Sequence, residues 1–115
     1  MAAAKRAAPA GRELIKIMPA LTTKQISLHL KDIPNWSKRA QTIVRTFKFE
    51  GFLKSIDFVN RIARKAQKIN HHPDIDIRFD KVTLTLTTHD EGGITEKDNF
   101  LARECDGVFS EFFVL

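Results

Sequence analysis

Residues 74–88, DIDIRFDKVTLTLTT, alternate apolar and polar side chains along almost their whole length. The apolar positions are Ile75, Ile77 and Phe79 in the first half and Val82, Leu84 and Leu86 in the second. A period of two is typical of β-strands that bury one face. Asp80-Lys81 interrupts the alternation, so we expect a β-hairpin that turns at these two residues.

Two amphipathic helices are predicted on either side of this hairpin. Upstream, apolar side chains recur at spacings of three and four between Gly51 and Asn70; they are Phe52, Ile56, Val59, Ala63 and Ala66. Downstream, Gly92-Gly93 breaks the sheet, and Thr95 followed by Asp98 resembles a capping box at a helix start. A helical stripe then follows, made of Leu101, Cys105, Val108 and Phe112.

The N-terminal half adds a helix and a longer strand. Thr22 or Thr23 with Gln25 predicts a capped helix over about residues 22–32, which Pro34 ends. Residues 43–49 have strand periodicity, and we expect them to pair with a short strand near Trp36. The order α-β-α-β-β-α, without regular βαβ repeats, predicts an α+β fold: a two-layer sandwich whose antiparallel sheet is covered on one face by helices.

Length and composition limit the architecture and the class of protein. The 115 residues, 43% hydrophobic and 29% charged, suffice for one domain with one core. One cysteine, Cys105, excludes an intrachain disulfide and is expected as a buried thiol rather than a nucleophile. No apolar stretch approaches the roughly 20 residues of a membrane span, so we expect a soluble cytoplasmic protein with no membrane partner.

The net charge of +5 comes mostly from the N-terminus. Residues 1–17 have four basic side chains and one acidic one, which leaves only +2 for the predicted domain, residues 18–115. Such a weak field argues against nucleic acid as a partner. The alanine-rich segment 1–17 is expected to be a flexible basic extension; an organelle transit peptide, a cloning remnant and an alternative start at Met18 all fit it.

Three of the four histidines in the chain belong to one spaced cluster with an aspartate: His71-His72, His89 and Asp98. Imidazole exchanges protons near neutral pH, which makes the cluster the candidate catalytic site. Each member also has an ordinary structural explanation, His89 as a surface residue at a strand end and Asp98 as a helix cap. A zinc or iron site is the other chemical alternative, although adjacent histidines are poorly directed to bind one ion together.

The segments around the cluster resemble the pterin-4a-carbinolamine dehydratase family. They are NHHPD at 70–74, KVTLTLTTHD at 81–90 and GGITEKD at 92–98, and the resemblance extends over about residues 20–110, including Trp36 and VRTFKF at 44–49. It implies four strands per subunit and dehydration of 4a-hydroxytetrahydrobiopterin, or a related pterin, to the quinonoid dihydropterin. It also implies a functional link to an aromatic amino acid hydroxylase in pterin recycling, and dimers assembled into tetramers.

Carried onto this chain, the resemblance implies that His71 and His89 transfer protons, that His72 contacts the pterin and that Asp98 orients the site. Trp36 and Gln67 are further candidates for substrate binding. The pterin is the substrate, so neither a cofactor nor a metal is expected. Which histidine is the acid and which the base stays open at this point.

Gln67 departs from the family pattern, which commonly has an acidic residue four positions before the first histidine. A glutamine amide can accept an imidazole N–H but cannot stabilise imidazolium by charge, so we expect Gln67 to alter the titration of His71. Phe79 keeps an aromatic ring where the family has tyrosine or tryptophan.

The alternative function is non-enzymatic. An animal member of the family also acts as a coactivator that binds the dimerisation domain of a transcription factor, so a similar interaction role is the second hypothesis for this chain. Self-association is expected in either case, because the small sheet leaves open edges and residues 109–115 are strongly apolar.

Overall fold

The computed structural model describes residues 19–113, so the predicted extension at 1–17 and the last two residues lie outside the described part. The elements within it are the helices α2 (Thr23–Leu30), α3 (Phe52–Ile69) and α4 (Glu96–Glu111), the strands β1 (Ser37–Arg39), β2 (Thr42–Lys48), β3 (Asp74–Arg78) and β4 (Lys81–Leu86), and the 3-10 turn η2 (His89–Glu91). None of the helices in residues 19–113 is long and apolar enough to cross a membrane.

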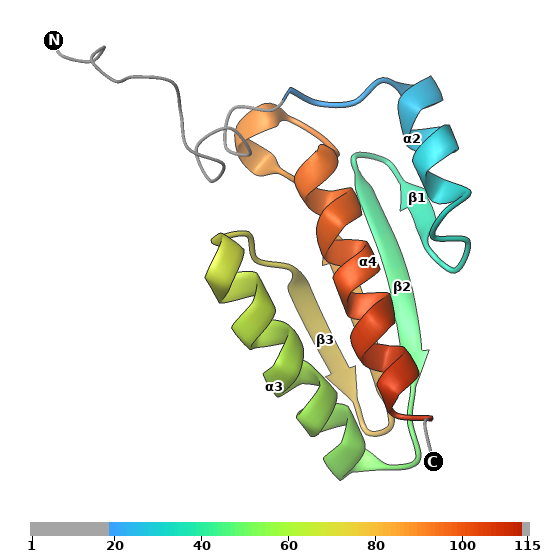
Figure 1. Ribbon diagram of the computed structural model, residues 1–115, viewed down its shortest axis with the longest axis vertical. Coiled ribbons are helices and arrows are strands. Elements are labelled where there is room, and N and C mark those ends of the chain that lie inside the picture. The colour runs from blue at the N-terminus through green and yellow to red at the C-terminus, as the bar shows by residue number, and fades with distance from the viewer. Residues whose placement is uncertain (1–18, 114–115) are drawn as a thin grey trace, which may run out of the picture.

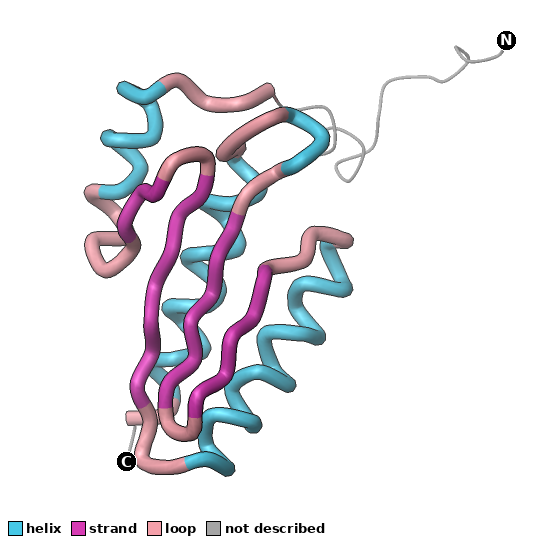
Figure 2. Tube along the Cα trace, turned by 180° about the vertical axis from the view of Figure 1, so that it is seen from behind, coloured by secondary structure: helices cyan, strands magenta, loops and turns pink. Residues whose placement is uncertain are grey.

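The four strands form one antiparallel sheet in the order β1-β2-β4-β3. Helices α3 and α4 lie side by side on one face of this sheet (Figure 1), and the opposite face is left open (Figure 2). The predicted α+β class, with an antiparallel sheet covered on one face by helices, is therefore confirmed. The threonines of β4 lie on the open face, and its valine and leucines lie beneath the helices.

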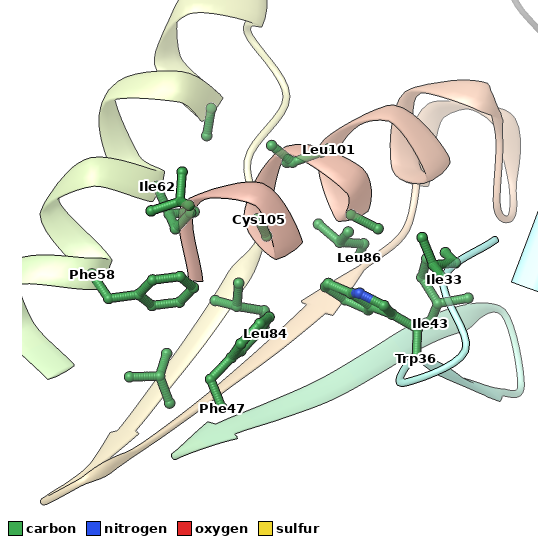
Figure 3. Close-up of a cluster of buried hydrophobic side chains, with 14 of the residues drawn as sticks. Ile33, Trp36, Ile43, Phe47, Phe58, Ile62, Leu84, Leu86, Leu101 and Cys105 are labelled. Atoms are coloured by element: carbon green, nitrogen blue, oxygen red, sulfur yellow. The ribbon is translucent and has the colours of Figure 1, made fainter. Parts of the chain in front are cut away.

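The core lies between the sheet and the helices. Leu84 and Leu86 of β4 and Phe47 of β2 are fully buried there, and Leu101 and Cys105 of α4 pack onto them (Figure 3). The stripe predicted for α4 and the buried thiol are therefore confirmed. Burial raises the pKa of the Cys105 thiol to about 12, because the low-dielectric core disfavours the thiolate.

The stripe predicted for α3 is wrong in its position. The structure buries Ser55, Phe58, Ile62 and Ala66, and only Ala66 belonged to the prediction. Phe52 and Ala63 are exposed instead. Two neighbouring series on this helix have spacings of three and four, and the series that contains the larger Phe58 and Ile62 faces the core because it removes more apolar area from water.

The turn of the β3–β4 hairpin also differs from the prediction by one residue. Arg78 pairs with Lys81, so the turn is formed by Phe79 and Asp80 rather than by Asp80 and Lys81. Phe79 has φ = 53°, in the left-handed region that bulky residues rarely adopt, and 67% of it is exposed. Lys48 and Lys81 form ion pairs with Asp80, and these pairs lower the pKa of its carboxyl.

Both predicted helix-start caps are present. Thr22 caps α2 and exchanges hydrogen bonds with Gln25, and Thr95 does the same with Asp98 at the start of α4. Helix α2 ends at Leu30, two residues earlier than expected. The α4 cap is important for the site, because it fixes the position of a buried carboxylate.

Candidate active site

The end of α3 directs the two adjacent histidines to different environments. Asn70 ends the helix in the left-handed conformation, with φ = 54°, and its N–H donates back to the last turn. The His71 N–H also donates to the carbonyl of Ala66, at 3.1 Å. The chain reverses here, and as a result His71 is 7% exposed while His72 lies on the surface.

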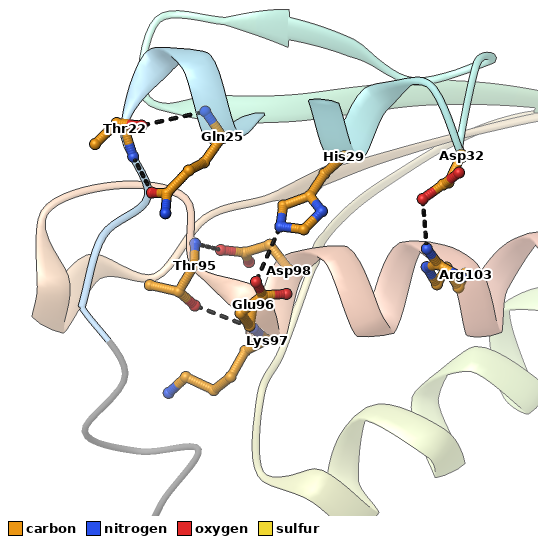
Figure 4. A network of polar contacts seen from close by, with 9 residues as sticks. All are labelled: Thr22, Gln25, His29, Asp32, Thr95, Glu96, Lys97, Asp98 and Arg103. Atoms are coloured by element: carbon orange, nitrogen blue, oxygen red, sulfur yellow. Dashed lines mark hydrogen bonds and ion pairs between the residues drawn. The ribbon is translucent and has the colours of Figure 1, made fainter. Parts of the chain in front are cut away.

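The buried His71 ring is bound to the capping aspartate of α4. Its Nε2 lies 2.6 Å from Oδ1 of Asp98, which has no exposed surface. The other carboxylate oxygen, Oδ2, accepts from the Thr95 N–H at 2.9 Å and from the Thr88 hydroxyl at 2.8 Å. Figure 4 shows the contact between Thr95 and Asp98 at the start of the helix. One carboxylate thus caps α4 and orients the imidazole.

The hydroxyl of Thr88 connects this network to a second threonine. Thr88 Oγ1 lies 2.8 Å from Thr95 Oγ1. Each hydroxyl has one hydrogen, and that of Thr88 goes to Asp98, so the Thr95 hydroxyl is the donor between the two threonines. Thr95 Oγ1 in turn accepts from the backbone N–H of Lys97. Both carboxylate oxygens of Asp98 are therefore hydrogen-bonded, which holds the carboxylate rigidly in place.

Gln67 contacts His72 rather than His71, the histidine that we expected it to affect. Its Oε1 lies 2.8 Å from Nε2 of His72, an exposed contact, and the partner of His71 is Asp98. The direct contact between Gln67 and His71 on which that expectation rested is therefore absent. The reversal at Asn70 is the reason, because it folds the side chain of His72 back over the last turn of α3 and leaves His71 facing inward.

His89 approaches the same place from the end of β4. The strand does not continue to His89, because Thr88 forms an isolated bridge with Gly93 and His89 begins the turn η2. Gly92 closes this turn with φ = 74°, a conformation that suits glycine. The His89 side chain is exposed and accepts or donates no hydrogen bond within residues 19–113.

These elements enclose a hollow of about 240 Å³. Its lining consists of Asn70, His71, His72, Thr87, Thr88, His89, Asp90 and Lys97. The structure therefore brings the three predicted histidines together, with Asp98 directly behind His71. The volume is slightly below the range of about 300–1,000 Å³ typical of ligand pockets, which suits partial enclosure of a small bicyclic molecule.

Trp36 and Phe79 lie elsewhere in the chain. Trp36 is 3% exposed, and its Nε1–H donates to Asp106 at 2.8 Å, so it is a core residue that does not line the hollow. Phe79 lies at the far end of the β3–β4 hairpin from the histidines. Within the described residues no group of three or more histidine, cysteine or acidic side chains is placed to hold a metal ion.

Five residues that line the hollow were not candidates in the sequence analysis: Asn70, Thr87, Thr88, Asp90 and Lys97. Thr88 continues the buried parity of Val82, Leu84 and Leu86, so a polar residue at a buried position was a detectable signal. Lys97 lines the hollow although it is only 8% exposed. It follows the helix cap without any periodicity that would have identified it.

Comparisons with known proteins agree on one family. A family model described as Pterin 4 alpha carbinolamine dehydratase matches residues 19–108. A protein of Picosynechococcus sp., named "Putative pterin-4-alpha-carbinolamine dehydratase", is 49% identical over 75% of this chain and 94% of its own length. A protein of Mycolicibacterium vanbaalenii with the same name is 46% identical over 79% of this chain and 98% of its own length.

Solved structures are similar as well. A "transcriptional coactivator/pterin dehydratase" from Brucella melitensis has a TM-score of 0.75 at 33% identity, covering 77% of this chain and 97% of that one. A pterin dehydratase-like protein described as a RuBisCO assembly factor in the alpha-carboxysome has a TM-score of 0.54 at 19% identity, covering 64% of this chain and 86% of that one. At that identity the second likeness concerns the fold alone.

Proposed function

The chain belongs to the pterin-4-alpha-carbinolamine dehydratase family, and we propose that it removes water from 4a-hydroxytetrahydrobiopterin, or a related pterin, to give the quinonoid dihydropterin. The observation that carries this proposal is the convergence of His71, His72 and His89 on one hollow. Two segments separated by the whole β3–β4 hairpin supply these imidazoles, and the turn that carries His89 has no evident structural need of one.

The reaction needs one proton delivered and one removed. The bond between C4a and the hydroxyl oxygen breaks, and the oxygen leaves as water after it receives a proton. The N5 proton is taken by a base, and its electron pair forms the new double bond to C4a. Two imidazoles, one protonated and one neutral, balance this elimination without a redox cofactor, and solvent restores their protonation afterwards.

The contacts of His71 support its role as the base. An ionised carboxylate only accepts hydrogen bonds, so Asp98 requires the hydrogen of His71 on Nε2, and the lone pair of the neutral ring is then on Nδ1. We therefore assign removal of the N5 proton to Nδ1 of His71. We assign the proton for the leaving hydroxyl to His89, whose exposed ring exchanges protons readily with water. His72, held by Gln67, contacts the pterin from the rim.

The wider setting follows from the family. A dehydratase of this kind acts after an aromatic amino acid hydroxylase, which forms the carbinolamine, and so belongs to pterin recycling; we place this activity in the cytoplasm. The pterin is a substrate, and the mechanism proposed here uses no metal or other cofactor.

Stopped-flow absorbance of freshly generated 4a-hydroxytetrahydropterin tests the proposal. Wild type should accelerate its decay, and His71→Gln and His89→Gln should each lose a factor of about 10²–10⁴, the usual contribution of one acid or base. His29→Gln is the matched control, because His29 is hydrogen-bonded to Glu96 and does not line the hollow. Decay at the spontaneous rate with wild type, or at the wild-type rate with both site variants, would overturn the proposed function.

A homo-oligomer joined along β3 belongs to the same proposal. This strand is at the edge of the sheet, and Ile75 on it is 38% exposed. Antiparallel pairing of two copies of β3 would bring Phe79, which follows one strand, close to Pro73, which precedes the other and adjoins the hollow. Sedimentation of wild type and Ile75→Lys at micromolar concentration tests this pairing, and a monomeric wild type would contradict it.

A second, non-enzymatic function has its own observation. The surfaces of α3 and α4 form a largely apolar groove of about 710 Å³, lined among others by Ile69, Phe100 and Leu101, with Arg64 and Lys68 also on its walls. Phe100 is 47% exposed. The groove fits an acidic amphipathic helix of a partner protein, and the Brucella melitensis neighbour is called a coactivator. If Phe100→Asp no longer binds the partner while His71→Gln still binds it, this role is supported. If Phe100→Asp still binds the partner, the groove is not the binding site.

A further inference from the structure

The hollow contains a cation that the mechanism above does not use. Lys97 lines it and is 8% exposed, which is rare for lysine unless the ammonium is paired. Within residues 19–113 no carboxylate lies within ion-pair distance of its Nζ, since neighbouring Glu96 is paired with His29 at 2.9 Å and Asp98 with His71 at 2.6 Å. Asp90 also lines the hollow but forms no ion pair with Lys97.

The position of Lys97 has no structural requirement for a charge. Its backbone N–H donates to the Thr95 hydroxyl in the α4 cap, and any residue except proline would supply that contact. Most of the side chain is covered, but within residues 19–113 its Nζ is not one of the fully buried polar atoms that lack a partner, so the ammonium itself is not sealed in the core. An ammonium donates three hydrogen bonds and accepts none. The side chain is therefore suited to a ligand atom that only accepts.

The substrate class of the proposed function has such an atom next to the reacting bond. In a 4a-hydroxytetrahydropterin the carbonyl oxygen on C4 is attached to the carbon adjacent to C4a. The 4a-hydroxyl and the N5 hydrogen are already assigned to imidazoles, whereas the carbonyl oxygen is an acceptor without an assigned donor. We propose that Lys97 is a substrate-binding residue whose ammonium donates to the C4 carbonyl oxygen of the pterin, and this inference rests on the proposed function.

The contact has a defined effect on affinity and selectivity. A hydrogen bond from a charged donor corresponds to roughly a 10- to 100-fold difference in binding. Lys97 is attached to the first turn of α4 immediately before Asp98, so it fixes the carbonyl relative to the carboxylate that orients His71. It selects pteridines with oxygen at C4 over those with an amino group there. An amino group at C4 would place its own hydrogen-bond donors against the ammonium, and no hydrogen bond would form between the two.

Equilibrium binding to two probes tests the proposal without turnover. The probes are 7,8-dihydropterin, with oxygen at C4, and its 2,4-diamino analogue, with nitrogen at C4, each titrated by fluorescence against wild type, Lys97→Met and Lys97→Arg. Wild type should prefer the 4-oxo probe by about 10- to 100-fold. Lys97→Met, which keeps the length and the apolar stem, should lose this preference, and Lys97→Arg should retain most of it.

The controls separate this inference from the function beneath it. Lys24→Met removes a lysine from the exposed surface of α2 and should bind both probes like wild type. Lys97→Met should be about as stable as wild type to urea, because it keeps the covered stem of the side chain and removes an ammonium that forms no ion pair within residues 19–113. A wild type that binds the 4-oxo probe while Lys97→Met keeps the same affinity and preference would overturn the role of Lys97 alone. A wild type that neither binds the probe nor accelerates dehydration would overturn the proposed function, and the inference with it.

Discussion

Replacing Thr88 with valine should destabilise the fold through the network behind His71. The hydroxyl of Thr88 is buried, donates to the Asp98 carboxylate at 2.8 Å and accepts from Thr95 at 2.8 Å. A hydrogen bond to a charged group stabilises by about 1.5–3 kcal/mol and a neutral one by about 1 kcal/mol. The extra buried methyl of valine offsets about 0.8 kcal/mol. We expect Thr88→Val to lower the free energy of unfolding by about 2 kcal/mol.

Urea unfolding at pH 7 measures this loss, with Trp36 as the probe, since it is the only tryptophan of the chain and is buried. Heating should show a melting temperature lower by roughly 8–16 °C, given a shift of about 4–8 °C per kcal/mol in a domain of this size. Thr88→Ser keeps the hydroxyl and should lose less. Thr85→Val, at a half-buried position on the open face of β4, should change stability by less than about 0.5 kcal/mol. A Thr88→Val variant as stable as Thr85→Val would refute the reasoning.

Three further outcomes follow from residues outside the hollow. Burial raises the pKa of Cys105 to about 12, so the thiolate fraction at pH 8 is only about 10⁻⁴. Iodoacetamide should therefore label Cys105 slowly in the native protein and readily in 6 M urea. Equal labelling rates would contradict its burial. The pKa of Asp80 is lowered, first by its hydrogen bond with Lys48, so the ionised carboxylate stabilises the fold at pH values above the unfolded pKa near 3.8. This stability is lost as the pH falls through the folded pKa. Asp80→Asn should therefore be less stable than wild type at pH 7 and equally stable in acid, which urea midpoints at several pH values would show. Phe79→Gly should raise the free energy of unfolding by about 0.5–1 kcal/mol. The backbone strain of a bulky residue at φ = 53° is larger than the chain entropy that glycine loses on folding. A destabilised variant in the urea assay would mean that the Phe79 ring makes stabilising contacts.

Most of the fold could be predicted because its signals are local. The alternation in β4 and the caps at Thr22 and Thr95 depend on residues within a few positions, and the structure confirms them. The α3 stripe was misplaced because two series with helical spacing compete on one helix, and only packing against Leu84 and Phe47 selects between them. That choice depends on contacts between distant segments, which periodicity does not contain.

The candidate site shows the same division. The spacing of His71, His89 and Asp98 identified the cluster, but the partners inside it depend on three-dimensional turns. Because Asn70 is in the left-handed conformation, Gln67 contacts His72, and His71 contacts Asp98. Lys97 shares the hollow with residues that are distant in the sequence, so no pattern along the chain predicts its burial.

The capping role of Asp98 has a consequence for how this site would decay during evolution. Losing the aspartate would unravel the start of α4 as well as release His71, so selection for a folded protein retains it even where catalysis has lapsed. His89, exposed on a short turn, has no such second duty and would drift early. Among descendants of this fold that have taken up other work, the aspartate is therefore a mark of ancestry, and the histidine on the turn is the better mark of a working enzyme.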